Sequence, residues 1–397
     1  MAEFYRKKLK NGMIILFEKR DIDVVSVAST IKFGAAYEDE KIKGISHFLE
    51  HLMFKGTKTR SHEEIVREIE KKGGILNAYT SEEITSYWAK LPSKHFFSGL
   101  NITSDLILNP KIDKIEFEKE KNVIIEEIKM YKDNPLYYVN DKIKEFLYKK
   151  PFGMSIAGKE EIIKKLTREE VIELFKKNYT ADSMILTAVG KVDFDEICKK
   201  VETIFPSTKR SLIEHNPVKI TAEEIEKRKG IDQAHFVFGF HSPSLIEKEK
   251  HAYEIAGVYL FGGMSSVLFE EIREKRGLAY AVKGSFDLGK KFGYGTIYVG
   301  TMKEKVKEVK EIILTEIKNL KDLKQKDFEE CKEQLIGNKN IVEEDSTNVM
   351  NALMIEETAG NAEEYYKYEE RIRAVKLDDV RKIAKLKSFS SFALVPE

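Results

Sequence analysis

Apolar and polar residues alternate in several short runs, which predicts β-strands. The alternation in DQAHFVFGFHSP, residues 232–243, places four apolar side chains on one face of a strand, namely Ala234, Phe236, Phe238 and Phe240. The other face carries His235 and His241, which we expect to face solvent rather than to bind a ligand. Near the N-terminus, the apolar run MIILF, residues 13–17, is too short for a signal sequence and is predicted to be the first strand.

Longer segments repeat apolar residues every three or four positions, which predicts amphipathic helices. Each half of the chain has strands first, then several helices, then a short helix and a closing strand. The two closing segments, residues 167–190 and 377–397, share an acidic pair, a valine, a helical period, a polar turn and an apolar strand. This predicts an α+β fold of two duplicated domains, each a mostly antiparallel or mixed β-sheet covered by helices.

The boundary between the halves is predicted at FPSTKRSLIEHNPVKI, residues 205–220, which has two prolines and little periodicity. We expect an N-terminal domain over residues 1–210 and a C-terminal domain over 221–397, joined by this linker. The length of 397 residues is sufficient for two such domains.

Composition narrows the possible partners and compartment. Lys plus Arg is 68 and Asp plus Glu is 67, so the net charge of +1 gives no general attraction to nucleic acid or membranes. The chain has two cysteines, Cys198 and Cys331, too few for a disulfide framework, and no run of 18 apolar residues. We expect a cytoplasmic protein that binds neither nucleic acid nor membrane.

The segment GISHFLEHLMFKGT, residues 44–57, holds the strongest chemical signal. On a helix at about 100° per residue, its apolar residues gather on one side, and His47, Glu50 and His51 gather on the other. Histidines at positions i and i+4 lie one turn apart and can bind one cation, with the glutamate available as a proton acceptor. This H-x-x-E-H order fits a zinc peptidase, but two histidines on a helix surface would also explain it.

A catalytic zinc needs a third protein ligand, and residues 116–135, EFEKEKNVIIEEIKMYKDNP, supply candidates. Glu120 and Glu127 are seven residues apart and project from nearly one face of the predicted helix, whereas Glu126 points to solvent. Apolar residues share the face of the first two, namely Phe117, Val123 and Ile124. Buried carboxylates are costly unless they are paired or bind a metal. A charge-rich amphipathic helix without a metal remains the alternative.

Four motifs in order make the chain resemble the pitrilysin, or M16, peptidase family. They are H-x-x-E-H at 47–51, E-x6-E at 120–127, GILNAYTSEEITSYWAKLP at 74–92 and GGMSSVLFEEIREKRGLAYAV at 262–282. The resemblance covers nearly the whole chain and is to the short two-domain type, like mitochondrial processing peptidase subunits and bacterial half-chamber peptidases.

The resemblance implies a role for each matching residue of the first half. His47, His51 and Glu127 would bind one zinc ion per chain, and Glu50 would take a proton from the zinc-bound water. Glu120 would orient a ligand and adjust the charge of the site.

It also implies residues that bind the substrate. Asn77 and Ala78 would lie on an edge strand to which an extended peptide adds as a further strand. Arg273 and Tyr280 would hold the peptide backbone, and Tyr280 would assist the oxyanion. Without the resemblance, Arg273 reads as a surface cation on a helix that begins at Ser265, and Tyr280 as a strand core residue.

The function implied is zinc-dependent endopeptidase activity on unstructured peptides inside a closed chamber. The chain would be half of that chamber and would act as a homodimer. Two other functions stay open: a non-catalytic structural or partner subunit of the same family, and a peptidase dedicated to processing one precursor.

Overall fold

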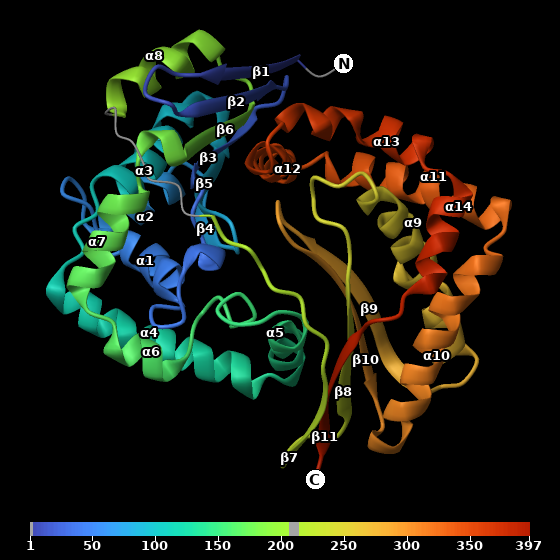
Figure 1. The fold of residues 1–397 in the computed structure, drawn as a ribbon. Coiled ribbons are helices and arrows are strands. Elements are labelled where there is room, and N and C mark those ends of the chain that lie inside the picture. Colours follow the sequence, from blue (N-terminus) through green and yellow to red (C-terminus); the bar gives the residue numbers. More distant parts are fainter. Residues whose placement is uncertain (1–2, 206–213) are drawn as a thin grey trace. The chain divides into compact units, whose positions relative to one another are not determined.

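The computed structural model describes residues 3–205 and 214–397, so residues 206–213 of the predicted linker lie outside the described part. The described chain forms two compact units (Figure 1). The first unit comprises Met1–Ile128, Ser155–His215 and Glu343–Tyr365, and the second comprises Lys129–Met154, Asn216–Val342 and Tyr366–Glu397. Each unit therefore contains a segment from the other half of the sequence.

The first unit is built on a six-stranded sheet in the order β1-β2-β6-β3-β5-β4. Its strands are β1 (Glu3–Lys8), β2 (Ile14–Lys19), β3 (Val24–Ile31), β4 (Ile75–Thr80), β5 (Thr85–Pro92) and β6 (Met184–Gly190). The pair β2–β6 is parallel, and the other neighbours are antiparallel. β4 is consequently an edge strand.

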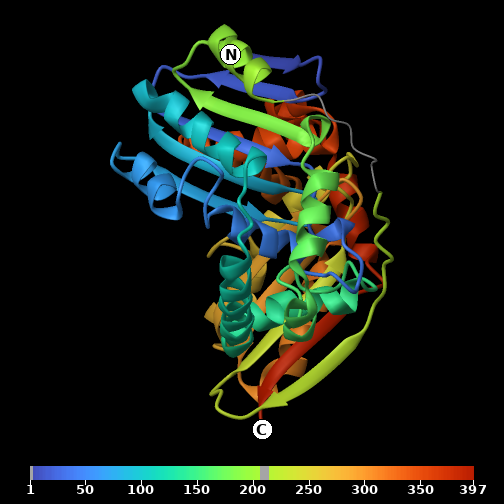
Figure 2. The same cartoon turned by 90° about the vertical axis from the view of Figure 1, so that its left-hand side faces the viewer.

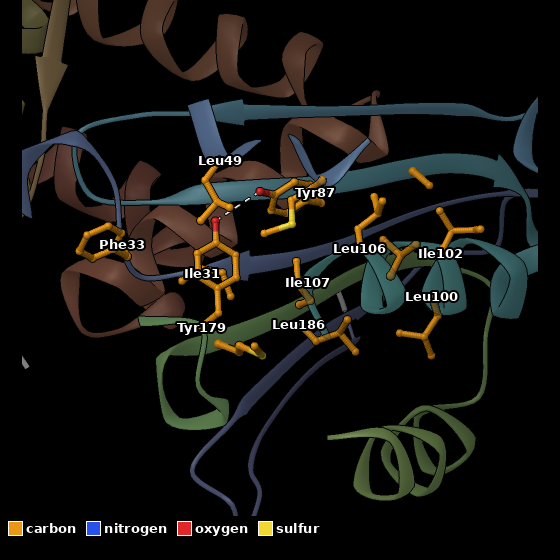
Figure 3. Close-up of a cluster of buried hydrophobic side chains, with 14 of the residues drawn as sticks. Ile31, Phe33, Leu49, Tyr87, Leu100, Ile102, Leu106, Ile107, Tyr179 and Leu186 are labelled. Atoms are coloured by element: carbon orange, nitrogen blue, oxygen red, sulfur yellow. Dashed lines mark hydrogen bonds between the residues drawn. The ribbon is translucent and has the colours of Figure 1, made fainter. Parts of the chain in front are cut away.

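Helices cover the sheet of the first unit (Figure 2). The buried apolar residues between these helices and the sheet form the core of the unit. The helices are α1 (Ile45–Met53), α2 (His62–Glu70), α3 (Phe96–Leu108), α4 (Lys114–Asp133), α6 (Glu160–Lys165), α7 (Arg168–Asn178), α8 (Phe194–Ile204) and α12 (Ser346–Ala359); α4 continues into the second unit. Figure 3 shows part of this core, where Leu49 of α1 lies near Tyr87 of β5 and Tyr179. The two buried tyrosine hydroxyls are 3.3 Å apart and hydrogen-bond to each other. The metal-motif helix is therefore anchored in a well-packed core.

The second unit repeats this plan with a five-stranded sheet in the order β7-β11-β8-β10-β9. Its elements are β7 (Glu223–Arg228), β8 (Ala234–His241), β9 (Ala279–Leu288), β10 (Gly293–Thr301), β11 (Ser390–Pro396), α5 (Pro135–Leu147), α9 (Lys250–Phe261), α10 (Val306–Asn319), α11 (Gln325–Val342), α13 (Tyr368–Ala374) and α14 (Leu377–Arg381). The pair β7–β11 is parallel and the others are antiparallel, as in β2-β6-β3-β5-β4. The predicted α+β fold with two duplicated mixed sheets is confirmed.

One helix that covers each sheet comes from the other half of the sequence. α12, from the second half, packs against β3 and β6, and α5, from the first half, packs against β8 and β11. The two helices occupy equivalent places in the chain, each following a long helix, α4 or α11.

Because α5 packs on β8, His235 does not face solvent as the sequence pattern predicts. The residue is 8% exposed, and its Nδ1 lies 2.9 Å from the hydroxyl of Tyr298. On the same face of β8, a Cβ at Gly239 would lie 2.9 Å from Ile143 of α5, which explains why a predicted solvent face is covered. His241 is partly buried and its Nε2 donates to the carbonyl of Ile220 at 3.0 Å. The expectation that both histidines face solvent is therefore wrong.

Within the described residues, no helix combines the length and the apolar character needed to cross a membrane.

Candidate metal centre

The H-x-x-E-H segment forms α1, and its two faces separate as predicted. All five apolar residues are at most 1% exposed, namely Ile45, Phe48, Leu49, Leu52 and Met53. His47 and His51 are only partly buried on the opposite face, with their ring centroids 4.7 Å apart. The burial of one face therefore fixes the direction of both imidazoles.

α4 supplies the carboxylates that the spacing predicted. Glu120 is 2% exposed, Glu127 is partly buried and Glu126 is exposed. The expectation for Val123 is wrong, since it is 48% exposed and lies at the margin of the buried face rather than within it. The two carboxylates reach the side of α4 that meets α1.

Three side chains converge where a cation could bind. One donor atom each from His47, His51 and Glu127 lies within 4.8 Å of the others. Glu127 Oε2 is 3.7 Å from His47 Nε2 and 3.4 Å from His51 Nε2. Two ligands about 2.1 Å from a tetrahedral zinc ion are about 3.4 Å apart, and imidazole and carboxylate are zinc ligands. The donor set therefore fits zinc.

Glu120 and Lys55 lie behind the three candidate ligands, and Glu120 holds His51 in place. Glu120 Oε1 is 2.9 Å from His51 Nδ1, and its Oε2 is 2.8 Å from Lys55 Nζ. This contact turns His51 Nε2 towards Glu127, as carboxylates commonly orient metal-binding histidines. Burial raises the pKa of Glu120, but hydrogen bonds from His51 and Lys55 outweigh it and hold that pKa below the usual range.

The two histidines differ in their affinity for protons. Burial, with a further contribution from nearby His51, lowers the pKa of His47 to about 4. Burial would also lower the pKa of His51, but its bonds to Glu120 and Glu127 raise it to about 9. A metal must replace the proton on His51 at neutral pH, which makes binding depend on pH.

Glu50 lies beside this group and is held by the end of β4. It is 9% exposed, and Thr80 Oγ1 donates to its Oε2 at 2.6 Å. Burial raises the pKa of Glu50, and the Thr80 bond opposes that shift. A carboxylate of raised pKa is suited to accept and return a proton. The sequence patterns indicated no role for Thr80, although it lies within the quoted segment 74–92 that carries Asn77 and Ala78.

Asn77 and Ala78 lie on the edge strand β4, against which α1 packs. Asn77 is exposed, and its Oδ1 accepts a hydrogen bond from the Ala78 amide at 2.8 Å. The predicted edge strand thus lies next to the helix that carries His47 and His51.

Arg273 and Tyr280 belong to the second unit and contact each other there. Arg273 lies in a π-helix, Phe269–Glu274, and helical conformation begins at residue 267 rather than at Ser265. Gly277 follows with φ +58°, and its amide donates to the carbonyl of Arg273 at 3.0 Å. Tyr280 on β9 is 83% exposed, so it is not a strand core residue, and Arg273 Cζ lies 5.1 Å from its ring centroid.

Comparisons with known proteins identify the class of protein. Residues 14–160 match the family model described as "Insulinase (Peptidase family M16)", and residues 165–335 match "Peptidase M16 inactive domain". The chain belongs to peptidase family M16. The donor set lies within the first match, and Arg273 and Tyr280 lie within the second.

Two sequence relatives match most of the chain, and two solved structures share its fold. An "uncharacterized zinc protease" of Rickettsia felis is 33% identical, with 98% of this chain and 95% of the relative covered. The "uncharacterized zinc protease YmxG" of Bacillus subtilis is 33% identical over 84% of this chain and 82% of its own. A protease structure from Helicobacter pylori has a TM-score of 0.91 at 20% identity and covers 100% of both chains. A putative M16-like peptidase from Alicyclobacillus acidocaldarius has a TM-score of 0.87 at 17% identity, covering 100% of this chain and 99% of that one. The structures support the fold alone, and the sequence relatives support a zinc protease family.

Proposed function

We propose that the chain is a zinc-dependent endopeptidase that hydrolyses unstructured peptides. The convergence of His47, His51 and Glu127 on one point beside Glu50 carries the proposal. In it, the first three residues hold one zinc ion per chain, and Glu120 orients His51. The relatives named as zinc proteases support the same metal.

A bound zinc ion would supply Lewis acidity, polarising the attacking water and the peptide carbonyl. Glu50 takes the proton of that water at its carboxylate and returns it to the leaving amine. Thr80 holds the carboxylate in place by its bond to Oε2. Proton transfer is thereby confined to one fixed group.

The substrate would be held largely through its backbone. An extended peptide adds to the free edge of β4 at Asn77 and Ala78, which tolerates many side-chain sequences. Arg273 and Tyr280 bind the peptide backbone, and the Tyr280 hydroxyl donates to the carbonyl oxygen as charge develops. The high exposure of Tyr280 suits a residue that contacts a substrate.

Two other functions within the family are the alternatives. A non-catalytic structural or partner subunit would not need a complete donor set with a base. Here His47, His51 and Glu127 lie close together, and Glu50 interacts electrostatically with His51 and Glu127. A dedicated precursor-processing peptidase would have the same site and differ in its substrate. Cleavage of unrelated peptides by the purified chain favours the general endopeptidase.

Metal removal tests the proposal directly. We expect the zinc-loaded protein to cleave an unstructured peptide of about thirty residues, chelation to abolish cleavage, and added zinc to restore it, because the water and carbonyl need polarisation. The measurement is product formation by mass spectrometry. Cleavage that survives complete removal of the metal would contradict a zinc mechanism.

We also propose a cytoplasmic homodimer that forms a closed chamber, in which the substrate residues of the second unit of one copy serve the zinc site of the other. Family resemblance to half-chamber peptidases supports this assembly. We expect sedimentation to give twice the mass of the 45.8 kDa chain under conditions of full activity. A fully active monomer would contradict the assembly and leave the chemistry of the metal site unaffected.

A further inference from the structure

A fully buried ion pair lies where the chain enters α1. The side chains of Glu38 and Lys43 are both 0% exposed, and Lys43 Nζ lies 4.0 Å from Glu38 Oε2. Lys43 also donates to the carbonyl of Ala35 at 2.6 Å. Burying both charges is costly, and similar-sized apolar residues often give equal or greater stability. Stability alone therefore does not explain this pair.

The Glu38 side chain caps the N-terminus of α1 in place of the N-cap residue. The N-cap residue is Gly44, at φ +100°, and it has no side chain to accept the first amides of the helix. Instead, Glu38 Oε2 accepts from the Gly44 amide at 2.9 Å and Oε1 accepts from the Ser46 amide at 2.7 Å. Ser46 directly precedes His47, so Glu38 fixes the backbone one residue before the first candidate ligand.

The same junction ties α1 to the end of β4. The short 3-10 helix Ala35–Tyr37 precedes Glu38, and its Ala35 and Ala36 amides donate to the carbonyls of Ser81 at 3.0 Å and Glu82 at 2.7 Å. Lys43 bonds to this turn through the Ala35 carbonyl. Three residues after His47, Glu50 accepts the bond from Thr80. α1 is therefore tied to the end of β4 both before and after His47.

Close packing leaves the start of α1 little freedom. A Cβ at Gly44 would lie 2.7 Å from the carbonyl oxygen of Ala157, and a Cβ at Gly158 would lie 2.3 Å from that of Lys43. The backbone at residues 43–44 is in contact with the backbone at residues 157–158. A change at the ion pair therefore cannot be accommodated by a shift of residues 43–44. It would be passed to the first turn of α1.

We propose that Glu38 and Lys43 form a positioning pair that sets α1 so that His47 and His51 meet Glu127. In this role the pair contributes to metal affinity and hardly to the global stability of the chain. The inference rests on the proposed metal site.

The double variant Glu38→Gln/Lys43→Met tests this role, because it removes both buried charges and nearly preserves volume. The carboxamide that replaces the Glu38 carboxylate keeps one acceptor oxygen for two amides, so the first turn of α1 should lose its fixed position. We expect urea unfolding of the metal-free variant close to that of wild type, with a zinc dissociation constant raised at least about tenfold. Zinc affinity is measured by competition with a chromophoric chelator, and bound Co²⁺ should give an altered absorption spectrum.

Two control variants show what unchanged and weakened zinc affinity look like in the same measurement. Arg6→Met/Glu357→Gln neutralises another pair in the first unit, 2.8 Å apart, and should leave zinc affinity unchanged. Glu120→Gln alters a residue in direct contact with His51 and should weaken zinc binding about 10–100-fold.

Unchanged zinc affinity in the folded double variant would overturn the inference and leave the proposed function intact. Loss of cooperative unfolding would also overturn it, since the pair would then be a stability element. If wild type itself bound no zinc, the proposed metal site and this inference would both fail.

Discussion

Glu50→Gln should bind zinc as tightly as wild type and lower kcat by about 10²–10⁴-fold. The carboxamide has nearly the same shape, and its oxygen can still accept the hydrogen bond that Thr80 donates to Glu50 Oε2 at 2.6 Å. It cannot take the proton of the attacking water, so the loss should fall on kcat rather than on KM. Metal content and peptide cleavage, measured on the same preparation, check the expectation.

Glu126→Gln is the matched control, because the residue is an exposed glutamate on α4 beside the candidate ligand Glu127. It should leave both kcat and zinc content unchanged. Near wild-type cleavage by zinc-loaded Glu50→Gln would reject Glu50 as the base. Loss of zinc together with activity would instead make Glu50 a structural support of the site.

Leu353→Ala should destabilise the first unit by about 2–5 kcal/mol, although it lies in the second half of the sequence. Leu353 is 0% exposed on α12 and packs in a cluster with residues of β2, β3 and β6, such as Leu16, Ala28 and Ile185. Removing the isobutyl group leaves a cavity that the rigid sheet cannot fill. Urea unfolding followed by circular dichroism gives the change in the free energy of unfolding.

Ile341→Ala on α11 is the comparison, since Ile341 is 70% exposed and should change stability by less than about 0.5 kcal/mol. An equally small effect of Leu353→Ala would argue against α12 as the cover of the first sheet.

The candidate site was largely predictable because its residues lie on two helices with clear apolar faces. In α1, the 100° period separates His47, Glu50 and His51 from the apolar side. In the structure His47 and His51 are partly buried, whereas Glu50 is 9% exposed. In α4, the same period correctly assigned Glu120 to the buried side and Glu126 to solvent. It wrongly placed Val123 on the buried face, because this residue lies at the margin of that face. Periodicity locates the centre of a buried face better than its edges.

The sequence was less informative where a contact joins distant segments. The bond from Thr80 to Glu50 and the burial of Glu38 against Lys43 both depend on how α1 meets the end of β4. Neither pair has a spacing within a single helix or strand that would reveal it. Only the position of Thr80 within a recognised segment gave a signal.

The sequence by itself determined the class of fold, the two repeated halves and the face of α1 that carries the metal motif. These follow from local periodicity, since the spacing of apolar residues within a helix or strand determines which of its faces is apolar. The tertiary structure decided which element covers each face: α12 covers β3 and β6, and α5 covers β8 and buries the side of His235. A pattern states that a face needs cover, but the covering segment is selected by packing between residues far apart in the chain.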